Sequence, residues 1–124
     1  IGARVLAGEA ALGRTTAAAY AERLARAATS RVPDSYESLV ALGVALSAQG
    51  RVAEAATVLD RAVVLAPQRP DGWIQRAIAR ATLGRVDEAL ADLERAREIV
   101  PRSPVVRRLV RQVGRLAGDS AVGG

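Results

Sequence analysis

The sequence predicts an all-α protein in which antiparallel helix pairs stack into an α-solenoid. Nine residues of one segment return 34 positions later, and a fixed period of this length is typical of stacked helical repeats. Half of the residues are apolar, and Ala, Val and Leu supply most of them, a composition that suits closely packed helices. The sequence contains no alternating apolar and polar run bounded by hairpin turns, which a β-sheet protein would require.

Two copies of the repeat are in phase over most of their length. The matching pairs are Gly50 and Gly84, Arg51 and Arg85, Val52 and Val86, Glu54 and Glu88, Ala55 and Ala89, Leu59 and Leu93, Arg61 and Arg95, Ala62 and Ala96, and Pro67 and Pro101. Because a unit of this size buries its apolar face only against its neighbours, we expect the units to stack in register.

Residues 3–33 are predicted to form a degenerate repeat before the two clear ones. Gly13 is followed by Arg, as Gly84 is, and Pro33 stands one period before Pro67. The interval between glycine and proline is about one helical turn longer here than in the clear repeats, so the match is weaker.

The first clear repeat is predicted over residues 36–69. Asp34 or Ser35 can cap its first helix by accepting hydrogen bonds from free backbone amides. Gly50 suits the left-handed backbone that ends a helix, and the second helix must stop before Pro67. The apolar face of the first helix is predicted to hold Leu39, Leu42, Gly43 and Leu46.

The second clear repeat is predicted over residues 70–103, with Pro70 at its start, Gly84 at its turn and Pro101 at its end. The residues expected to point inward from its first helix are Trp73, Ala77 and Ala81. The acidic residues expected on the outer face of its second helix, near the N-terminus where the helix dipole favours negative charge, are Asp87, Glu88 and Asp92.

A capping helix is predicted over residues 104–117, which completes a single domain over 1–117, and residues 118–124 are expected to be a flexible tail. Its apolar side is predicted to hold Val105, Val106, Leu109, Val110, Val113 and Leu116. Its basic cap face is predicted to hold Arg107, Arg108, Arg111 and Arg115. We interpret that face as solubilising, because few aromatic residues are available to stack on bases, and nucleic-acid binding is therefore not expected.

Composition excludes several kinds of chemistry. The chain has no Cys, His or Met, which excludes disulfides, nucleophiles activated by His, and zinc or haem sites that use those ligands. No glycine-rich phosphate loop is present, so we expect no enzyme, no metal and no cofactor. No apolar run is long enough to cross a bilayer. All 18 basic residues are Arg, a bias typical of a GC-rich bacterial genome.

The residue pattern resembles the tetratricopeptide repeat, a family of helix-turn-helix units. In the first repeat the family's characteristic positions hold Leu39, Leu42, Gly43, Leu46, Ala55, Leu59, Ala62 and Pro67. In the second they hold Trp73, Arg76, Ala77, Arg80, Ala89, Leu93, Ala96 and Pro101. The small residues and prolines match best, whereas Leu or Arg replaces the family's aromatic residues. The resemblance implies a right-handed α-solenoid with two clear repeats, one degenerate N-terminal repeat and a C-terminal capping helix.

The resemblance also implies that the first helices of successive repeats line a concave groove for an extended peptide or a partner helix. The groove positions of the first repeat are Glu37, Val40, Val44, Ser47 and Ala48. Those of the second are Asp71, Ile74, Ile78, Ala81 and Thr82. Chaperone-binding members of the family hold a terminal carboxylate with Lys and Asn at such positions, whereas this chain has Val and Ile. The groove is therefore expected to prefer apolar side chains, unless N-terminal helices or a dimer mate bury it.

Arg76 and Arg80 lie one turn apart where the family has Leu and an aromatic residue. In one interpretation their stems cover apolar surface, and their charged ends reach water or a carboxylate on a neighbouring helix. In the other they form a two-pronged site for an anion or a carboxylate. The first interpretation is preferred.

These features predict a non-catalytic protein-protein interaction module that binds a peptide or helix of a partner. One alternative is a self-association scaffold in which the basic end of one copy meets the acidic middle of another. Another is the docking arm of a larger enzyme or membrane protein, since the first residue, Ile1, indicates a fragment. We expect a cytoplasmic location, with a soluble periplasmic domain of an exported or membrane-anchored protein as the alternative.

Overall fold

The computed structural model describes residues 17, 19–23, 26 and 35–123, and every regular element within them is helical. The helices are α2 (Tyr36–Ala48), α3 (Val52–Leu65), α4 (Pro70–Thr82), α5 (Val86–Ile99) and α6 (Pro104–Gly123). The all-α fold class is confirmed. Most of the degenerate repeat predicted over 3–33 lies outside the described residues.

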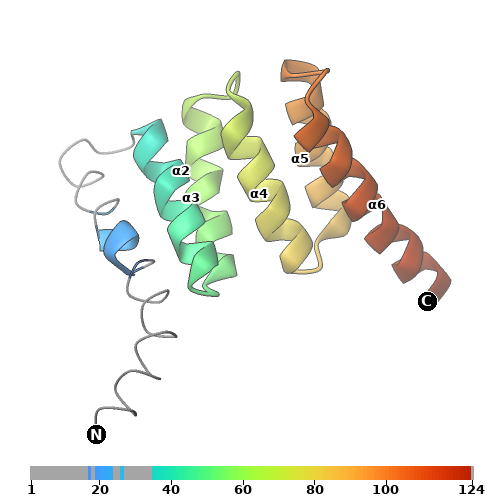
Figure 1. Ribbon diagram of the computed structural model, residues 1–124, viewed down its shortest axis with the longest axis horizontal. Helices are drawn as coiled ribbons and strands as arrows, with labels where there is room; N and C mark the ends of the chain where they lie inside the picture. Colours follow the sequence, from blue (N-terminus) through green and yellow to red (C-terminus); the bar gives the residue numbers. More distant parts are fainter. Residues whose placement is uncertain (1–16, 18, 24–25, 27–34, 124) are drawn as a thin grey trace, which may run out of the picture.

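The helices stack in chain order. The most extensive contacts join α2 to α3 and α4 to α5, and smaller ones join α3 to α4, α5 to α6 and α2 to α4. Figure 1 shows α2, α4 and α6 on the near side of the molecule, with the fainter α5 behind them. The first helices of successive units therefore follow one another along one side of the solenoid.

Both interhelical turns use glycine in the left-handed region. The φ angles of Gly50 and Gly84 are 81° and 83°, a conformation that side chains with a Cβ rarely adopt. After each glycine, the next backbone N–H donates back across the last helical turn, from Arg51 to Leu46 at 2.9 Å and from Arg85 to Arg80 at 2.8 Å. The 34-residue period is thus reproduced in the backbone.

The first helix pair is held together by leucine and alanine. Leu39 and Leu46 of α2 and Leu59 of α3 are fully buried. Gly43 makes this close packing possible, because a Cβ there would lie 2.7 Å from Cγ of Leu59. At the N-terminus of α2 the Ser35 hydroxyl accepts a hydrogen bond from the Ser38 amide at 3.5 Å, which selects Ser35 as the capping residue.

The Tyr36 hydroxyl forms one of the links between the two repeats. The first turn of α4 has no side-chain cap of its own, and the Gly72 amide instead donates to the Tyr36 hydroxyl oxygen at 2.8 Å. The bond is buried, and burial raises the pKa of Tyr36 above its ordinary value of 10.0, so the hydroxyl stays neutral. Tyr36 therefore satisfies a helix-end donor in the next repeat.

The last helix closes the core but ends later than predicted. Val113 shares a buried cluster with Ala77, Ala89 and Leu93, so α6 covers both helices of the second repeat. The boundary predicted at residue 117 is wrong, because α6 continues through Gly123 instead of giving way to a flexible tail at 118. No proline interrupts this segment, and its glycines tolerate helical φ angles. None of the described helices is long and apolar enough to cross a bilayer.

Candidate partner-binding face

The residues predicted to line a groove lie on the two neighbouring helices α2 and α4. We call the surface that they form the front face, since Figure 1 shows both helices on the near side. Val44 is 45 % exposed and Ile78 is 38 % exposed. Adjacent exposed aliphatic side chains of this size form an apolar surface patch. Val40 and Ile74 are half-buried beside them. The front face therefore offers apolar surface to a partner.

The other members of the front face are polar residues and alanines. Those that are exposed are Glu37, Ala48, Asp71 and Thr82, and those that are half-buried are Ser47 and Ala81. Arg69 pairs with Glu37 at 2.5 Å, and this hydrogen bond lowers the pKa of Glu37 below its ordinary value. Asp71 forms no ion pair with the described residues, but its charge interacts with Arg69 and Tyr36. The alternative in which N-terminal helices cover the face concerns residues outside the described part of the chain.

Arg76 and Arg80 bind a carboxylate of the chain itself. Arg76 reaches Asp92 of α5 with Nη2 at 2.7 Å and Nε at 3.1 Å, and its Nη1 lies 2.9 Å from Asp60 of α3. Arg80 Nη1 lies 3.1 Å from both Asp92 oxygens. Asp92 is only 2 % exposed, so the expectation that it lies on the outer face of the helix is wrong. The two arginines stand where the family has apolar residues, and the buried carboxylate of Asp92 on α5 neutralises their charge.

This arrangement agrees with one of the two interpretations of the arginine pair. Their charged ends reach carboxylates on neighbouring helices, as the preferred interpretation expected. An external anion would have to displace Asp92, a buried group with two partners. Arg80 Nε is buried without a hydrogen bond, and its nearest carboxylate oxygen, on Glu88, is 3.5 Å away. The cluster holds α3, α4 and α5 together and is not an open binding site.

Trp73 is half-buried beside this cluster. Its indole N–H donates to the Pro67 carbonyl at 2.9 Å, which ties α4 to the loop before it. The guanidinium carbons of Arg76 and Arg95 lie 5.1 and 5.4 Å from the ring centroid, a distance suited to cation–π attraction. Trp73 is thus engaged within the repeat and does not present a free stacking surface.

The basic residues of α6 are all exposed. Arg107, Arg108, Arg111 and Arg115 form no ion pair with any residue that the structure describes. Arg107 and Arg111 lie together with Arg97 of α5 around a depression at the end of the solenoid. The four arginines predicted for the basic cap face are therefore all exposed.

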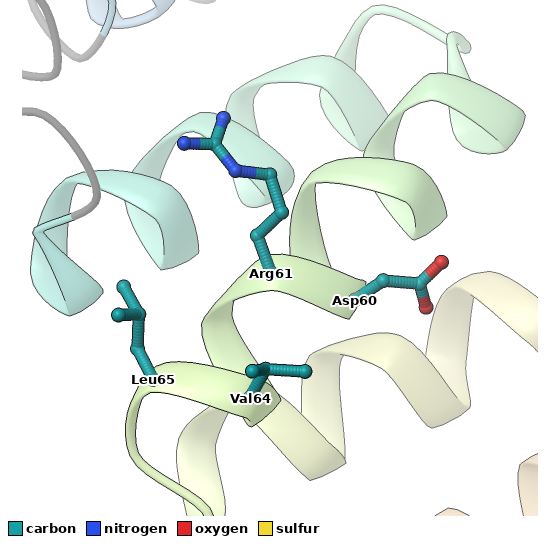
Figure 2. A pocket seen from close by; sticks show the side chains of 4 residues that line it. All are labelled: Asp60, Arg61, Val64 and Leu65. Atoms are coloured by element: carbon teal, nitrogen blue, oxygen red, sulfur yellow. The ribbon is translucent and has the colours of Figure 1, made fainter.

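Sequence reasoning missed a second apolar surface, on α3. Val64 is 79 % exposed, and it lines a depression of about 360 Å³ together with Asp60, Arg61 and Leu65. Figure 2 shows Val64 and Leu65 projecting from the end of α3, with Asp60 directed toward α4. The i and i+1 spacing of Val64 and Leu65 departs from the inner apolar stripe of α3, which could have revealed their exposure.

The described residues hold no cluster of three or more metal-ligating side chains. Some of the other carboxylates form exposed pairs within one helix, such as Arg95 with Glu98 and Arg97 with Glu94. Pairs of this kind are solvated and contribute little to stability or chemistry.

Solved structures of low identity share this fold. The tetratricopeptide repeat domain of Sgt2 from Aspergillus fumigatus is 24 % identical over 92 % of this chain and 76 % of that chain, with a TM-score of 0.81. The first such domain of human RPAP3 is 18 % identical over 94 % and 90 %, also with a TM-score of 0.81. The Yersinia enterocolitica secretion chaperone SycD, solved with a peptide of the translocator YopD, is 17 % identical over 97 % and 89 %, with a TM-score of 0.69.

Family comparisons agree with the structures. No curated protein matches the sequence. One tetratricopeptide repeat family matches residues 42–114, and a second matches residues 9–70. The first match alone covers more than half of the chain, from within α2 to within α6. The chain belongs to the tetratricopeptide repeat family.

Proposed function

We propose that this domain is a non-catalytic interaction module that holds an apolar peptide or helix of a protein partner on the front face. The observation that carries the proposal is the exposure of Val44 and Ile78 at the centre of two adjacent helices. An apolar patch bordered by polar residues is typical of an interaction site. Structures with the same fold support it, since SycD was solved with a YopD peptide and the first repeat domain of RPAP3 (Spaghetti) with an HSP90 peptide.

The chemistry of the chain supports binding over catalysis. The sequence has no His or Cys, and so it cannot assemble the nucleophile and base pairs that those residues provide. Its buried charged cluster is occupied by its own carboxylate. A partner held by apolar contacts needs none of these groups, since shape and burial supply the affinity.

Selection from a random peptide display library tests the proposal. The full 124-residue chain is immobilised, the enriched peptides are synthesised, and their Kd values are measured by titration. Val44→Glu and Ile78→Glu should each weaken the best peptide at least about tenfold, because a buried carboxylate has no partner at the centre of an apolar contact. Circular dichroism should show unchanged helix content.

Val64→Glu is the matched control, because it makes the same change at an exposed valine on α3. It should leave the Kd within about twofold of the wild type. Loss of binding in this variant, with no effect of Val44→Glu or Ile78→Glu, would move the binding site to the depression on α3 and overturn the proposal.

A further inference from the structure

We infer that α6 provides a third, basic row of the front face, and that the partner segment carries a cluster of Asp and Glu residues that lies on it. The inference rests on the proposed function and specifies the chemistry of the partner. Arg108 and Arg115 are the residues that would contact the acidic cluster.

The repeat period places these arginines on the front face. Adding 34 residues to the front-face positions of α4 leads to one set of residues on α6. That set is Val105, Arg108, Gln112, Arg115 and Leu116, which correspond to Asp71, Ile74, Ile78, Ala81 and Thr82. The helix α6 thus occupies the place of the first helix of a third repeat.

The packing of α6 agrees with this register. Val106 and Val113 are buried, and Val113 shares its cluster with Ala77 and Leu93, so this side of α6 faces the second repeat. All five residues of the third row are instead half-buried or exposed, with Val105 at 44 % and Leu116 at 46 % exposure. In α6 the large aliphatic side chains therefore stand at the two ends of the row, where α4 has Asp71 and Thr82, and polar residues occupy its centre.

Charge distinguishes the third row from the first two. Arg108 stands where α4 has Ile74, and Arg115 stands where it has Ala81. Neither guanidinium forms an ion pair with a described residue. Exposed guanidinium groups beside an apolar strip favour carboxylates, which they can bind through two parallel hydrogen bonds.

The spacing of the two arginines defines the partner further. Residues 108 and 115 are two helical turns apart, about 10 Å along the axis of α6. Carboxylates that both face α6 can reach this distance when they are about two or four residues apart in an extended chain, whose side chains alternate between faces, or about seven apart in a helix. The partner segment should therefore place apolar side chains on Val44 and Ile78 and at least two acidic residues at the end that crosses α6.

Charge reversal of the third row tests the inference with the same peptide library. The variant is Arg108→Glu with Arg115→Glu. The matched control is Arg107→Glu with Arg111→Glu, which makes the same change in net charge on the side of α6 that borders Arg97. Arg108→Gln with Arg115→Gln removes the charge without reversing it.

We expect peptides enriched on the wild type to combine apolar residues with a cluster of Asp and Glu. The Kd of the best peptide should rise at least about tenfold in the Arg108→Glu, Arg115→Glu variant, a change of about 1.4 kcal/mol, and less in the glutamine variant. Peptides selected on the charge-reversed variant should carry Lys and Arg in place of the acidic cluster. Binding of the acidic peptide should weaken with added salt.

Several outcomes overturn the inference. The inference is wrong if the enriched peptides lack an acidic cluster, or if the Arg107→Glu, Arg111→Glu control loses binding equally. Either result would leave the proposed function intact but show that Arg108 and Arg115 do not specifically contact the partner. Failure to enrich any peptide would refute both. Tighter binding of a single-stranded oligonucleotide, sensitive to the same charge reversal, would assign the row to nucleic acid. A concentration-dependent mass, abolished by the same variant, would assign it to self-association.

Discussion

Asp92 occupies an unusual place for an acidic residue, because it is buried between helices, beside two arginines that stand where the family pattern has apolar residues. Taking a carboxylate and two guanidinium groups out of water is costly, and their attraction offsets the cost only when the geometry is good. Here Asp92 receives bonds of 2.7 to 3.1 Å from both arginines. The cluster is thus stable as a set, and removal of one member leaves the others uncompensated.

We predict that Asp92→Ala lowers the free energy of unfolding by about 3 kcal/mol, at the lower end for a buried pair because Arg76 and Arg80 keep some contact with solvent. Urea unfolding followed by circular dichroism measures the change. Replacing all three residues by Leu should restore most of the stability, since apolar residues can substitute for a buried ion cluster. An unchanged urea midpoint for Asp92→Ala would show that the cluster contributes nothing.

The same residues show what sequence reasoning could and could not predict. The periodicity of apolar residues identified the buried leucines and alanines, because only apolar residues were counted as signals of the core. Asp92 was assigned to the outer face for that reason, although Arg76 and Arg80 at core positions indicated that a buried counter-charge was needed. The hydrogen bond from Gly72 to Tyr36 has no local signature, since its partners are 36 residues apart.

At the scale of helices, the turns were predicted correctly because they require a backbone conformation that glycine adopts far more readily than other residues. Gly50 and Gly84 require left-handed backbone, and both turns form there. The end of α6 was mispredicted because Gly118 was taken as the start of a tail, although a glycine without a following turn can remain helical. Arg108 and Arg115 were predicted as part of one basic face; the 34-residue period separates them from Arg107 and Arg111, and the packing of Val113 agrees with that register.

We predict that the same substitution has opposite effects in two helices. Gly43→Ala should lower the free energy of unfolding by about 1–3 kcal/mol, because its Cβ would meet Leu59 at 2.7 Å and force α2 and α3 apart. Gly114→Ala in α6 should raise it by about 0.5–1 kcal/mol, because a Cβ there meets nothing within 4 Å and alanine favours helix. Thermal unfolding of both variants measures the two changes in stability. A change in the same direction for both would contradict the prediction that the two glycines differ in packing.

At the scale of the whole molecule, ion pairs connect segments that are distant in sequence. Glu22 accepts hydrogen bonds from Arg26 at 2.9 Å and from Arg51 at 2.8 Å, which ties it to the turn between α2 and α3. Burial alone would raise the pKa of Glu22, but the two arginines outweigh it and lower that pKa. The hydrogen bond from Arg51 likewise lowers the pKa of Glu54. The pairs of Arg51 lie at the turn between α2 and α3, and the pair of Arg69 with Glu37 lies at the loop between α3 and α4.

These lowered pKa values predict that the domain loses stability in acid. Glu22, Glu37 and Glu54 ionise in the folded state below their ordinary value of 4.5, so the unfolded chain takes up protons first as the pH falls. The contribution of the three pairs is fully present above that value and is lost as the pH falls through the lowered pKa values. Urea midpoints measured at pH 7, 5 and 3 should therefore decline mainly between pH 5 and 3. A triple Glu→Gln variant at these positions should show a weaker decline, and high salt should weaken it in the wild type because the pairs are exposed to screening. If the urea midpoint of the triple variant falls as steeply with pH as that of the wild type, the acid sensitivity comes from other carboxylates and these three ion pairs do not cause it.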